Sequence, residues 1–179
     1  PSQIMENWAT EKEFLDLWAV NYQTGEPIPA EIVERIIAAQ NYLAAYLNVR
    51  QLSFGLTDMA WHTITEPFEG DVEQFEVASM APSQVQPVVP GTAMAPAFGH
   101  IFSGGYAAGY YGYKWAEVLE ADAFSLFKEK GIFNREVSGS FRENILSKGG
   151  TEHPMELYVR FRGHKPETKA LIEKMGLGK

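Results

Sequence analysis

The chain has 179 residues, of which 45% are hydrophobic and 13% aromatic, and its formal net charge is −8. This length suits one domain or part of a larger one, and the composition is typical of a packed core rather than of a disordered chain. The acidic balance argues against nucleic-acid binding, because neutralising phosphates needs a clustered basic face. No apolar run approaches the roughly 20 residues needed to cross a bilayer. We therefore expect neither a nucleic acid nor a membrane as partner.

The sequence contains no cysteine, which excludes a disulfide framework, a thiolate metal ligand and a cysteine nucleophile. This fits a reducing compartment, so the prediction is a cytoplasmic protein, with the periplasm left open. The four histidines are His62, His100, His153 and His164. They show no metal-ligand spacing among themselves, and the chain has no H-E-x-x-H motif. We expect no zinc site within this chain.

Helical periodicity runs through most of the chain. Apolar residues between Phe14 and Trp18 predict a first helix, and turn signals from Gly25 onward end that region. From Ala30, apolar residues recur on one helical face and predict a long helix that continues towards Thr63, with Gly55 as a point where it can bend. The residues of this face are Ile32, Ile36, Leu43 and Leu47.

The middle of the chain breaks this pattern. Asp71 is placed to cap a short helix, and residues 82–99 then contain four prolines. We interpret 82–99 as an ordered crossing loop rather than a flexible linker, because its valines, Met94 and Phe98 give it apolar anchors.

Helical patterns return in the last third of the chain. One helix is predicted to end at Gly131, and the next begins with Asn134 as its cap. Thr151 is placed to cap a short helix, Pro166 fits the first turn of the last one, and Gly176 fits its C-terminal cap. No strand pattern is convincing, so the predicted fold class is all-α, an irregular helical bundle.

The segment from His100 to Val118 is unusual because it mixes four tyrosines with four glycines: Tyr106, Tyr110, Tyr111, Tyr113, Gly104, Gly105, Gly109 and Gly112. Each glycine inside a helix costs about 1 kcal/mol relative to alanine. A helix that begins at Tyr106 would place Tyr106, Tyr110 and Tyr113 on one face. Spacing alone leaves two interpretations equally open: the wall of a polar cleft, or an amphipathic helix with half-buried tyrosines. The glycine spacing matches no phosphate-binding motif.

The order of these residues is more specific than their spacing. A histidine, Gly-Gly-Tyr, Tyr-Tyr-Gly-Tyr, a tryptophan and then an acidic helix resembles the C-terminal catalytic region of the thimet oligopeptidase family of zinc metallopeptidases. Three further stretches resemble segments of the same region: Pro1–Trp8, Phe141–Lys148 and Arg160–Leu177. The resemblance covers essentially the whole chain. The sequence of residues 107–124 looks closer to that of the peptidyl-dipeptidase branch of the family, also called dipeptidyl carboxypeptidase, than to that of the endopeptidases.

In this family the zinc motif and a third ligand, a glutamate, precede the region that resembles this chain. The resemblance therefore implies that residues 1–179 are the C-terminal portion of a zincin-like catalytic domain, with zinc bound upstream of Pro1 and the fragment inactive alone. Within it, 82–99 would be an ordered loop and 100–113 the substrate-binding segment. The implied partners are an oligopeptide substrate and the upstream half of the domain. Loss of that half would expose apolar surface and favour self-association.

The resemblance also implies roles for single residues. Tyr113 matches the tyrosine that stabilises the tetrahedral intermediate, and His100 matches a histidine that hydrogen-bonds substrate near the same centre. The implied substrate-binding residues are Tyr106, Tyr110, Gly104 and Gly105. We expect the glycine-rich loop to close over bound peptide and to carry Tyr106 with it. For each residue a structural role in the core stays open.

The leading predicted function of the parent protein is release of dipeptides from the C-termini of oligopeptides. Such an enzyme must hold a free carboxylate, for which an arginine or lysine is suited. Arg142 and Lys148 lie in the matching region, although no spacing selects either. Two alternatives stay open: an oligopeptidase of the same family that cuts internally, and a non-catalytic helical peptide-binding module.

Overall fold

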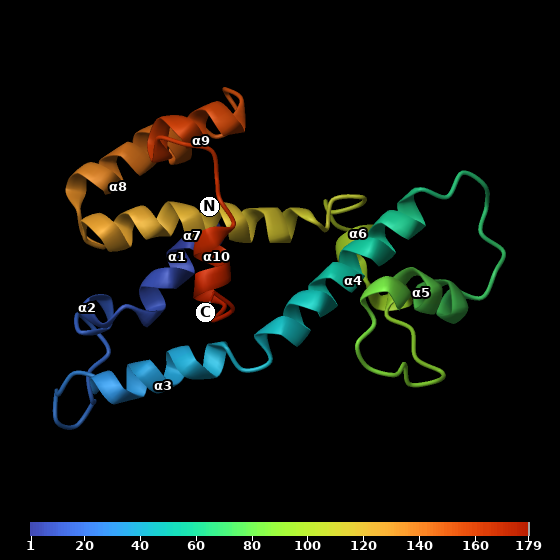
Figure 1. Ribbon diagram of the computed structural model, residues 1–179, viewed down its shortest axis with the longest axis horizontal. Helices are drawn as coiled ribbons and strands as arrows, with labels where there is room; N and C mark the ends of the chain where they lie inside the picture. Colours follow the sequence, from blue (N-terminus) through green and yellow to red (C-terminus); the bar gives the residue numbers. More distant parts are fainter. Residues whose placement is uncertain (179) are drawn as a thin grey trace. The chain divides into compact units, whose positions relative to one another are not determined.

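The computed structural model describes residues 1–178, and every regular element among them is helical (Figure 1). The only bridge pairing recorded for these residues is isolated and joins Val20 to Pro27. The prediction of an all-α chain is confirmed.

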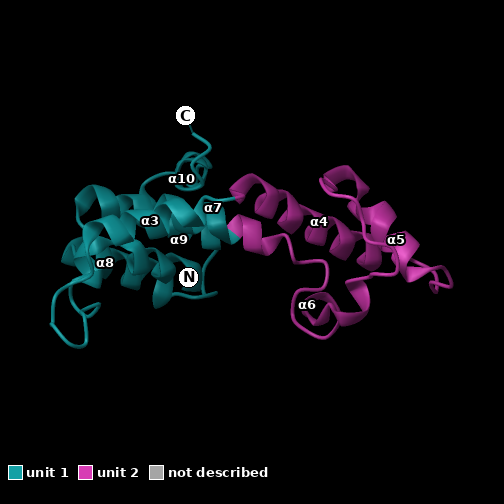
Figure 2. Ribbon diagram, turned by 90° about the horizontal axis from the view of Figure 1, so that it is seen from below, with its two compact units in different colours: residues 1–42, 116–179 teal, residues 43–115 magenta. Residues whose placement is uncertain are grey.

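The helices form two compact units (Figure 2). The first unit comprises residues 1–42 and 116–179, and the second comprises residues 43–115. Each unit has a hydrophobic cluster of its own.

The first unit is built on most of helix α7. Its elements are α1 (Ser2–Glu6), η1 (Asn7–Thr10), α2 (Lys12–Leu15), α3 (Ala30–Gln40), α7 (Gly112–Lys130), α8 (Arg135–Phe141), the π-helical turn η4 (Arg142–Leu146), α9 (Pro154–Arg162) and α10 (Lys169–Lys174). Phe127 of α7 is 2% exposed and packs on Phe141 of α8 at a ring distance of 6.0 Å. Phe141 in turn packs on Phe161 of α9 at 5.2 Å. These aromatic contacts hold α7, α8 and α9 around one core.

A buried polar network joins α7 to α9 in the same unit. The Tyr158 hydroxyl donates to Asp122 Oδ2 at 2.6 Å. Arg162 Nε donates to the backbone carbonyl of Asp122 at 3.0 Å, and its guanidinium lies 3.5 Å from Asp122 Oδ1. Because Asp122 is 4% exposed, these partners offset the cost of removing its carboxylate from water.

The second unit carries the segment that was predicted to bind substrate. Its elements are α4 (Ala44–His62), α5 (Val72–Met80), η2 (Ala81–Ser83), η3 (Ala95–Ala97), α6 (Gly99–Phe102) and the first residues of α7. Phe98, Ile101 and Tyr110 form the core of this unit, and Phe54 of α4 packs against them. In the crossing between α5 and α6, Phe98 is buried, whereas Val85 and Val89 are exposed.

Several predicted helix ends are confirmed. The Asp71 side chain accepts a hydrogen bond from Gln74 N at 2.9 Å, and the Asn134 side chain accepts from two backbone amides of α8. Gly131 follows α7 with φ of +103°, which favours glycine. Beyond α10, Gly176 has φ of +70° and donates to Glu173, while Leu177 donates to Ile172. These two bonds form a Schellman cap.

The predicted long helix from Ala30 towards Thr63 is wrong. The structure has two helices there, because Leu43 adopts the left-handed region with φ of +57°. Next to this break the Asn41 side chain lies against Gly176, where an added Cβ would be 3.4 Å from Asn41 Nδ2. Gly55 lies within continuous α4. A contact with a segment so distant in sequence cannot be read from hydrophobic periodicity.

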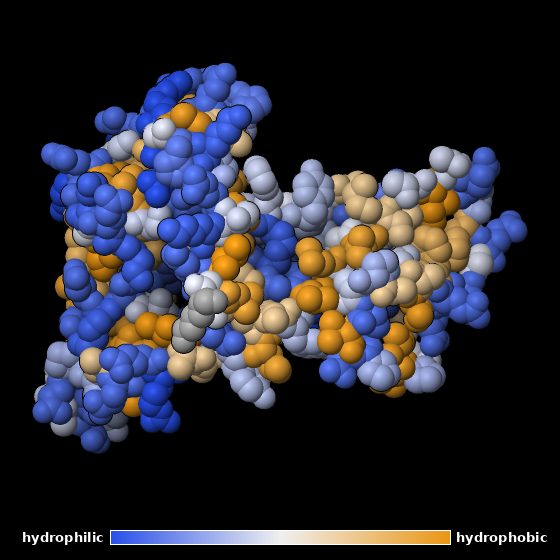
Figure 3. Space-filling model, in the orientation of Figure 1, coloured by the Kyte–Doolittle hydropathy of each residue, from blue (hydrophilic) through white to orange (hydrophobic). Residues whose placement is uncertain are grey.

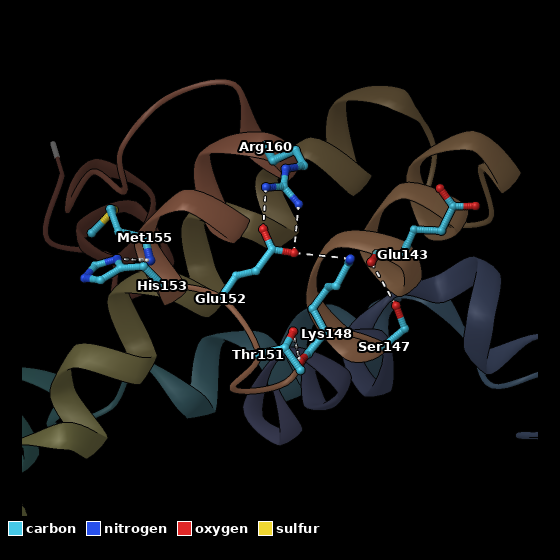
Figure 4. Close-up of polar contacts among 8 residues, drawn as sticks. All are labelled: Glu143, Ser147, Lys148, Thr151, Glu152, His153, Met155 and Arg160. Carbon is cyan, nitrogen blue, oxygen red and sulfur yellow. Dashed lines mark hydrogen bonds and ion pairs between the residues drawn. The ribbon is translucent and has the colours of Figure 1, made fainter.

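Two helix starts near the C-terminus also differ from prediction. The cap of α9 is His153, whose Nδ1 accepts from Met155 N at 3.2 Å, whereas the Thr151 hydroxyl donates to the Lys148 carbonyl (Figure 4). Pro154 then occupies the first helical position, where its missing N–H has no cost. Helix α10 begins at Lys169, so Pro166 lies before it.

Exposed apolar side chains are frequent, and apolar areas are visible on the surface in Figure 3. On α4 they include Leu47, Leu52, Leu56 and Met59, each at least 40% exposed. Single exposed apolar residues are ordinary, whereas α4 carries several of them. Among the described helices, none is both long enough and apolar enough to span a membrane.

Candidate functional site

The Gly/Tyr segment does not form the predicted helix from Tyr106. Residues 103–111 form successive turns, and α7 begins at Gly112. Gly109 N donates to the Tyr106 carbonyl at 2.9 Å, and Ala108 has φ of +52°. A non-glycine residue in this left-handed region interrupts helical geometry at a cost of roughly 1–2 kcal/mol. The turns therefore take the place of a helix.

These turns nevertheless bring the predicted site residues together. The ring centroids of Tyr106 and Tyr113 lie 4.9 Å apart, and those of Tyr110 and Tyr113 lie 5.1 Å apart. The His100 ring lies 6.1 Å from Tyr106 and 6.5 Å from Tyr113. We call His100, Tyr106, Tyr110 and Tyr113 the aromatic cluster.

The members of the aromatic cluster differ in exposure. Tyr110 is 9% exposed and its hydroxyl donates to Gln51 Oε1 at 2.9 Å, so it forms the base of the cluster. Tyr113 is half-buried, whereas His100 and Tyr106 are exposed. None of the hydrogen bonds recorded among residues 1–178 involves the His100 ring. Because the His100 side chain is also exposed, a ligand can reach its ring.

Tyr111 lies outside the aromatic cluster, because it is 63% exposed and makes no ring contact with the cluster in the described residues. The side chain projects into solvent, so Tyr111 serves as a comparison residue for the cluster.

Within the aromatic cluster, Tyr106 controls the acidity of Tyr113. A hydrogen bond with the Tyr106 side chain raises the pKa of Tyr113 to about 12, and burial adds to this increase. The Tyr113 hydroxyl therefore stays protonated throughout the neutral range. It can act as a neutral hydrogen-bond donor there.

Close packing explains one of the loop glycines. A Cβ added at Gly104 would lie 3.0 Å from the backbone oxygen of His100, and Gly104 N donates to the Gly99 carbonyl at 2.8 Å. A larger residue would push the loop away from α6. An added Cβ at Gly105 meets nothing within 4 Å, so this position faces open space.

A buried aspartate that the sequence did not single out holds the loop. Asp58 of α4 has no exposed surface, and its carboxylate accepts from Ala108 N at 2.9 Å and from Tyr110 N at 2.8 Å. An acidic residue among the apolar residues of α4 is the sequence signal that could have drawn attention to it.

Comparison with known proteins identifies the family. Residues 1–177 match the model of Peptidase family M3. The chain belongs to peptidase family M3. It is 49% identical to oligopeptidase A of Escherichia coli (strain K12) over 180 residues, which are 99% of this chain and 26% of that protein. The predicted resemblance is thus confirmed, and the chain spans about a quarter of the length of the curated relatives it matches.

Two further M3 relatives cover the chain to the same extent. Probable cytosolic oligopeptidase A of Arabidopsis thaliana is 40% identical, over 99% of this chain and 26% of its own length. Dipeptidyl carboxypeptidase of Escherichia coli (strain K12) is 37% identical, also over 99% of this chain and 26% of its own length.

Peptidases of family M3 are zinc metallopeptidases. Within residues 1–178, no group of three or more His, Cys, Asp or Glu side chains could hold a metal ion. The side chains present here do not make a zinc site.

The two cations considered for a substrate carboxylate both belong to the first unit. Arg142 begins the π-helical turn η4. Lys148 Nζ lies 3.2 Å from Glu152 Oε1, and Arg160 donates to the other oxygen of Glu152 at 2.7 Å (Figure 4). Lys148 is thus already paired with a carboxylate on its own surface.

Proposed function

We propose that the parent protein is a zinc metallopeptidase of oligopeptides, and that this chain supplies the wall that binds substrate and stabilises the oxyanion. The observation that carries this proposal is the aromatic cluster. In an M3 peptidase sequence, turns of the second unit gather His100, Tyr106 and Tyr113 within about 6.5 Å of one another, with His100 and Tyr106 exposed.

The cluster offers two kinds of hydrogen-bond donor to a reacting peptide. When a peptide carbonyl is attacked, its oxygen gains negative charge, and a preorganised donor lowers the barrier. The Tyr113 hydroxyl suits this role because its pKa of about 12 keeps it protonated at neutral pH, and on substrate binding its proton would turn from the Tyr106 oxygen to the peptide oxygen. The His100 ring has nitrogens available to bind the peptide next to the reacting carbonyl. Gly105 leaves open space for the peptide backbone.

The mode of cleavage has two candidates. The 49% identity to oligopeptidase A, against 37% to dipeptidyl carboxypeptidase, favours internal cleavage of short peptides. The second candidate is release of C-terminal dipeptides, which the sequence of residues 107–124 favours. A peptide with an amidated C-terminus separates them: an oligopeptidase keeps its activity on that peptide, and a peptidyl-dipeptidase loses it.

We further propose that zinc is held by residues outside this chain, so that the 179-residue chain is inactive alone and binds peptide only weakly. Its exposed apolar side chains, such as Leu52 and Leu56 of α4, would favour contact with the rest of the catalytic domain or self-association. A cytoplasmic location is proposed by analogy with the Arabidopsis relative, whose name includes the word cytosolic. A peptidase assay and sedimentation of the isolated chain test these points.

Hydrogen exchange of the full-length parent protein tests the substrate wall directly. A phosphinic peptide serves as the probe, because its tetrahedral phosphinate resembles the attacked carbonyl. If the proposal holds, the probe slows exchange in the segment 100–113 and leaves residues 132–141 of the first unit unchanged. Exchange in 100–113 that is unaffected by a saturating probe would contradict the proposal.

A further inference from the structure

Two buried carboxylates bracket the segment that carries His100 and Tyr106. Asp58 of α4 accepts the amides of Ala108 and Tyr110, as described above. Glu76 of α5 makes the same arrangement at the other end of the segment. Its carboxylate accepts from Met94 N at 2.8 Å and from Ala95 N at 2.6 Å. Both helices belong to the second unit (Figure 2).

These carboxylates are removed from water. Asp58 has no exposed surface and Glu76 is 8% exposed. Burying an ionised carboxylate is costly unless hydrogen bonds replace its hydration. Asp58 receives a third donor in His62, whose Nδ1 lies 2.9 Å from Oδ1 and 2.8 Å from the Asp58 carbonyl oxygen. Since both oxygens accept, His62 Nδ1 carries the proton.

The segment between the two carboxylates has little regular secondary structure, although Phe98 and Ile101 pack in the core of the unit. Its regular structure is limited to η3 and the four-residue helix α6, and residues 103–111 are turns. Ala108 is held in a left-handed conformation at the point where Asp58 binds its amide. Turns alone do not fix the direction of a side chain as well as a long helix does, so the anchors at the two ends add to core packing in fixing where the intervening residues lie.

We propose that Asp58 and Glu76 are positioning residues that act as a two-ended clamp on residues 94–110 and so hold His100 and Tyr106 against Tyr113. This inference rests on the proposed function of the aromatic cluster. Asp58 acts through Tyr110, whose ring lies 5.1 Å from that of Tyr113. Glu76 acts through the Met94 and Ala95 amides, just before Phe98, whose ring lies 5.9 Å from that of His100.

The test uses the full-length parent protein and three variants with the same chemical change, D58N, E76Q and D71N. Each replaces one carboxylate oxygen by an amide nitrogen, which cannot accept a hydrogen bond. Asp71 is the matched control, because it accepts a single amide at the start of α5 and asparagine is an equally good cap. Steady-state kinetics, hydrogen exchange and thermal unfolding are measured for all three.

We expect kcat to fall at least ten-fold in D58N and in E76Q, with a smaller change in KM, and to stay unchanged in D71N. Exchange should accelerate around Ala108 and Tyr110 in D58N and around Met94 and Ala95 in E76Q. If exchange accelerates but kcat equals that of D71N, the carboxylates are only structural and the proposal is wrong. If D58N does not fold, E76Q decides the question alone.

The Y113F variant separates this inference from the proposed function. If Y113F lowers kcat while D58N and E76Q do not, the clamp is wrong and the proposed function stands. If Y113F leaves kcat unchanged, the proposed function fails, and the clamp fails with it because its effect must pass through the aromatic cluster.

Discussion

The rings of Tyr106 and Tyr113 lie 4.9 Å apart with an interplanar angle of 30°, and the hydrogen bond between their side chains is the largest cause of the raised pKa of Tyr113. Tyr106 lies in a turn and Tyr113 in the first turn of α7. Moving the turn therefore changes both the position and the acidity of the Tyr113 hydroxyl. This relationship links the conformation of the loop to its proposed chemistry.

Removing the Tyr106 hydroxyl should lower the pKa of Tyr113 from about 12 towards its ordinary value of 10.0, because the hydrogen bond that favours the protonated form is lost. The raised pKa favours the folded state below about pH 10, and this contribution is lost as the pH rises through about 12. Carbon NMR of the tyrosine ring during a pH titration measures the effect in Y106F. Y111F is the control, and equal Tyr113 titration in both variants would contradict the account.

The carboxylate of Glu152 should titrate near pH 2, because hydrogen bonds from Arg160 and then from Lys148 lower its pKa from 4.5 to about 2 (Figure 4). Since the folded-state pKa is depressed, the pair stabilises the fold above about pH 4.5 and loses this effect as the pH falls towards about 2. NMR titration of the Glu152 carboxyl checks this. R160A should raise the pKa of Glu152, and 1 M salt should do so partly, because the Glu152 side chain is partly exposed. An unchanged pKa in R160A would count against the ion pair.

Tyr158→Phe should destabilise the chain by about 2 kcal/mol, because a buried carboxylate loses a hydrogen bond and keeps its desolvation cost. The bond joins the Tyr158 hydroxyl to Asp122 Oδ2 at 2.6 Å. Y22F is the matched control, since Tyr22 is 91% exposed. The free energy of unfolding in urea measures both variants. Equal stabilities would show that the hydroxyl contributes nothing to the α7–α9 contact.

Two glycine-to-alanine changes should act in opposite directions. Gly131→Ala forces a side chain into a backbone with φ of +103° and should destabilise the chain by about 1 kcal/mol or more. Gly139→Ala lies within α8, where an added Cβ meets nothing within 4 Å, and should stabilise it by about 0.5–1 kcal/mol. Thermal unfolding distinguishes them, and a destabilised G139A would mean that α8 does not tolerate the methyl group.

The parts of the fold that depend on nearby residues are predictable from the sequence. Asp71 and Asn134 cap helices through amides two or three residues away, and Gly176 closes a helix within one turn. The break at Leu43 is not predictable in this way, because it accompanies packing between Asn41 and Gly176, distant in sequence.

The aromatic cluster was also predictable only in part. The residues of the cluster follow from the family resemblance, but the predicted mechanism of assembly, one helical face, is wrong. Turns bring Tyr106 to Tyr113, and the Ala108 amide within those turns donates to Asp58, which lies 50 residues earlier. A hydrogen-bond partner so distant in sequence is hard to predict. The only sequence signal for Asp58 is that it is an acidic residue in an apolar helix.

The measurement that tests the central claim most directly is kcat of Y113F in the full-length parent protein, compared with Y111F. Tyr113 belongs to the aromatic cluster, and Tyr111 is 63% exposed outside it. If the Tyr113 hydroxyl stabilises the oxyanion, Y113F lowers kcat by about 10²–10³-fold with little change in KM, while Y111F stays near the unmodified enzyme. Equal kcat values in Y113F and Y111F would contradict the account.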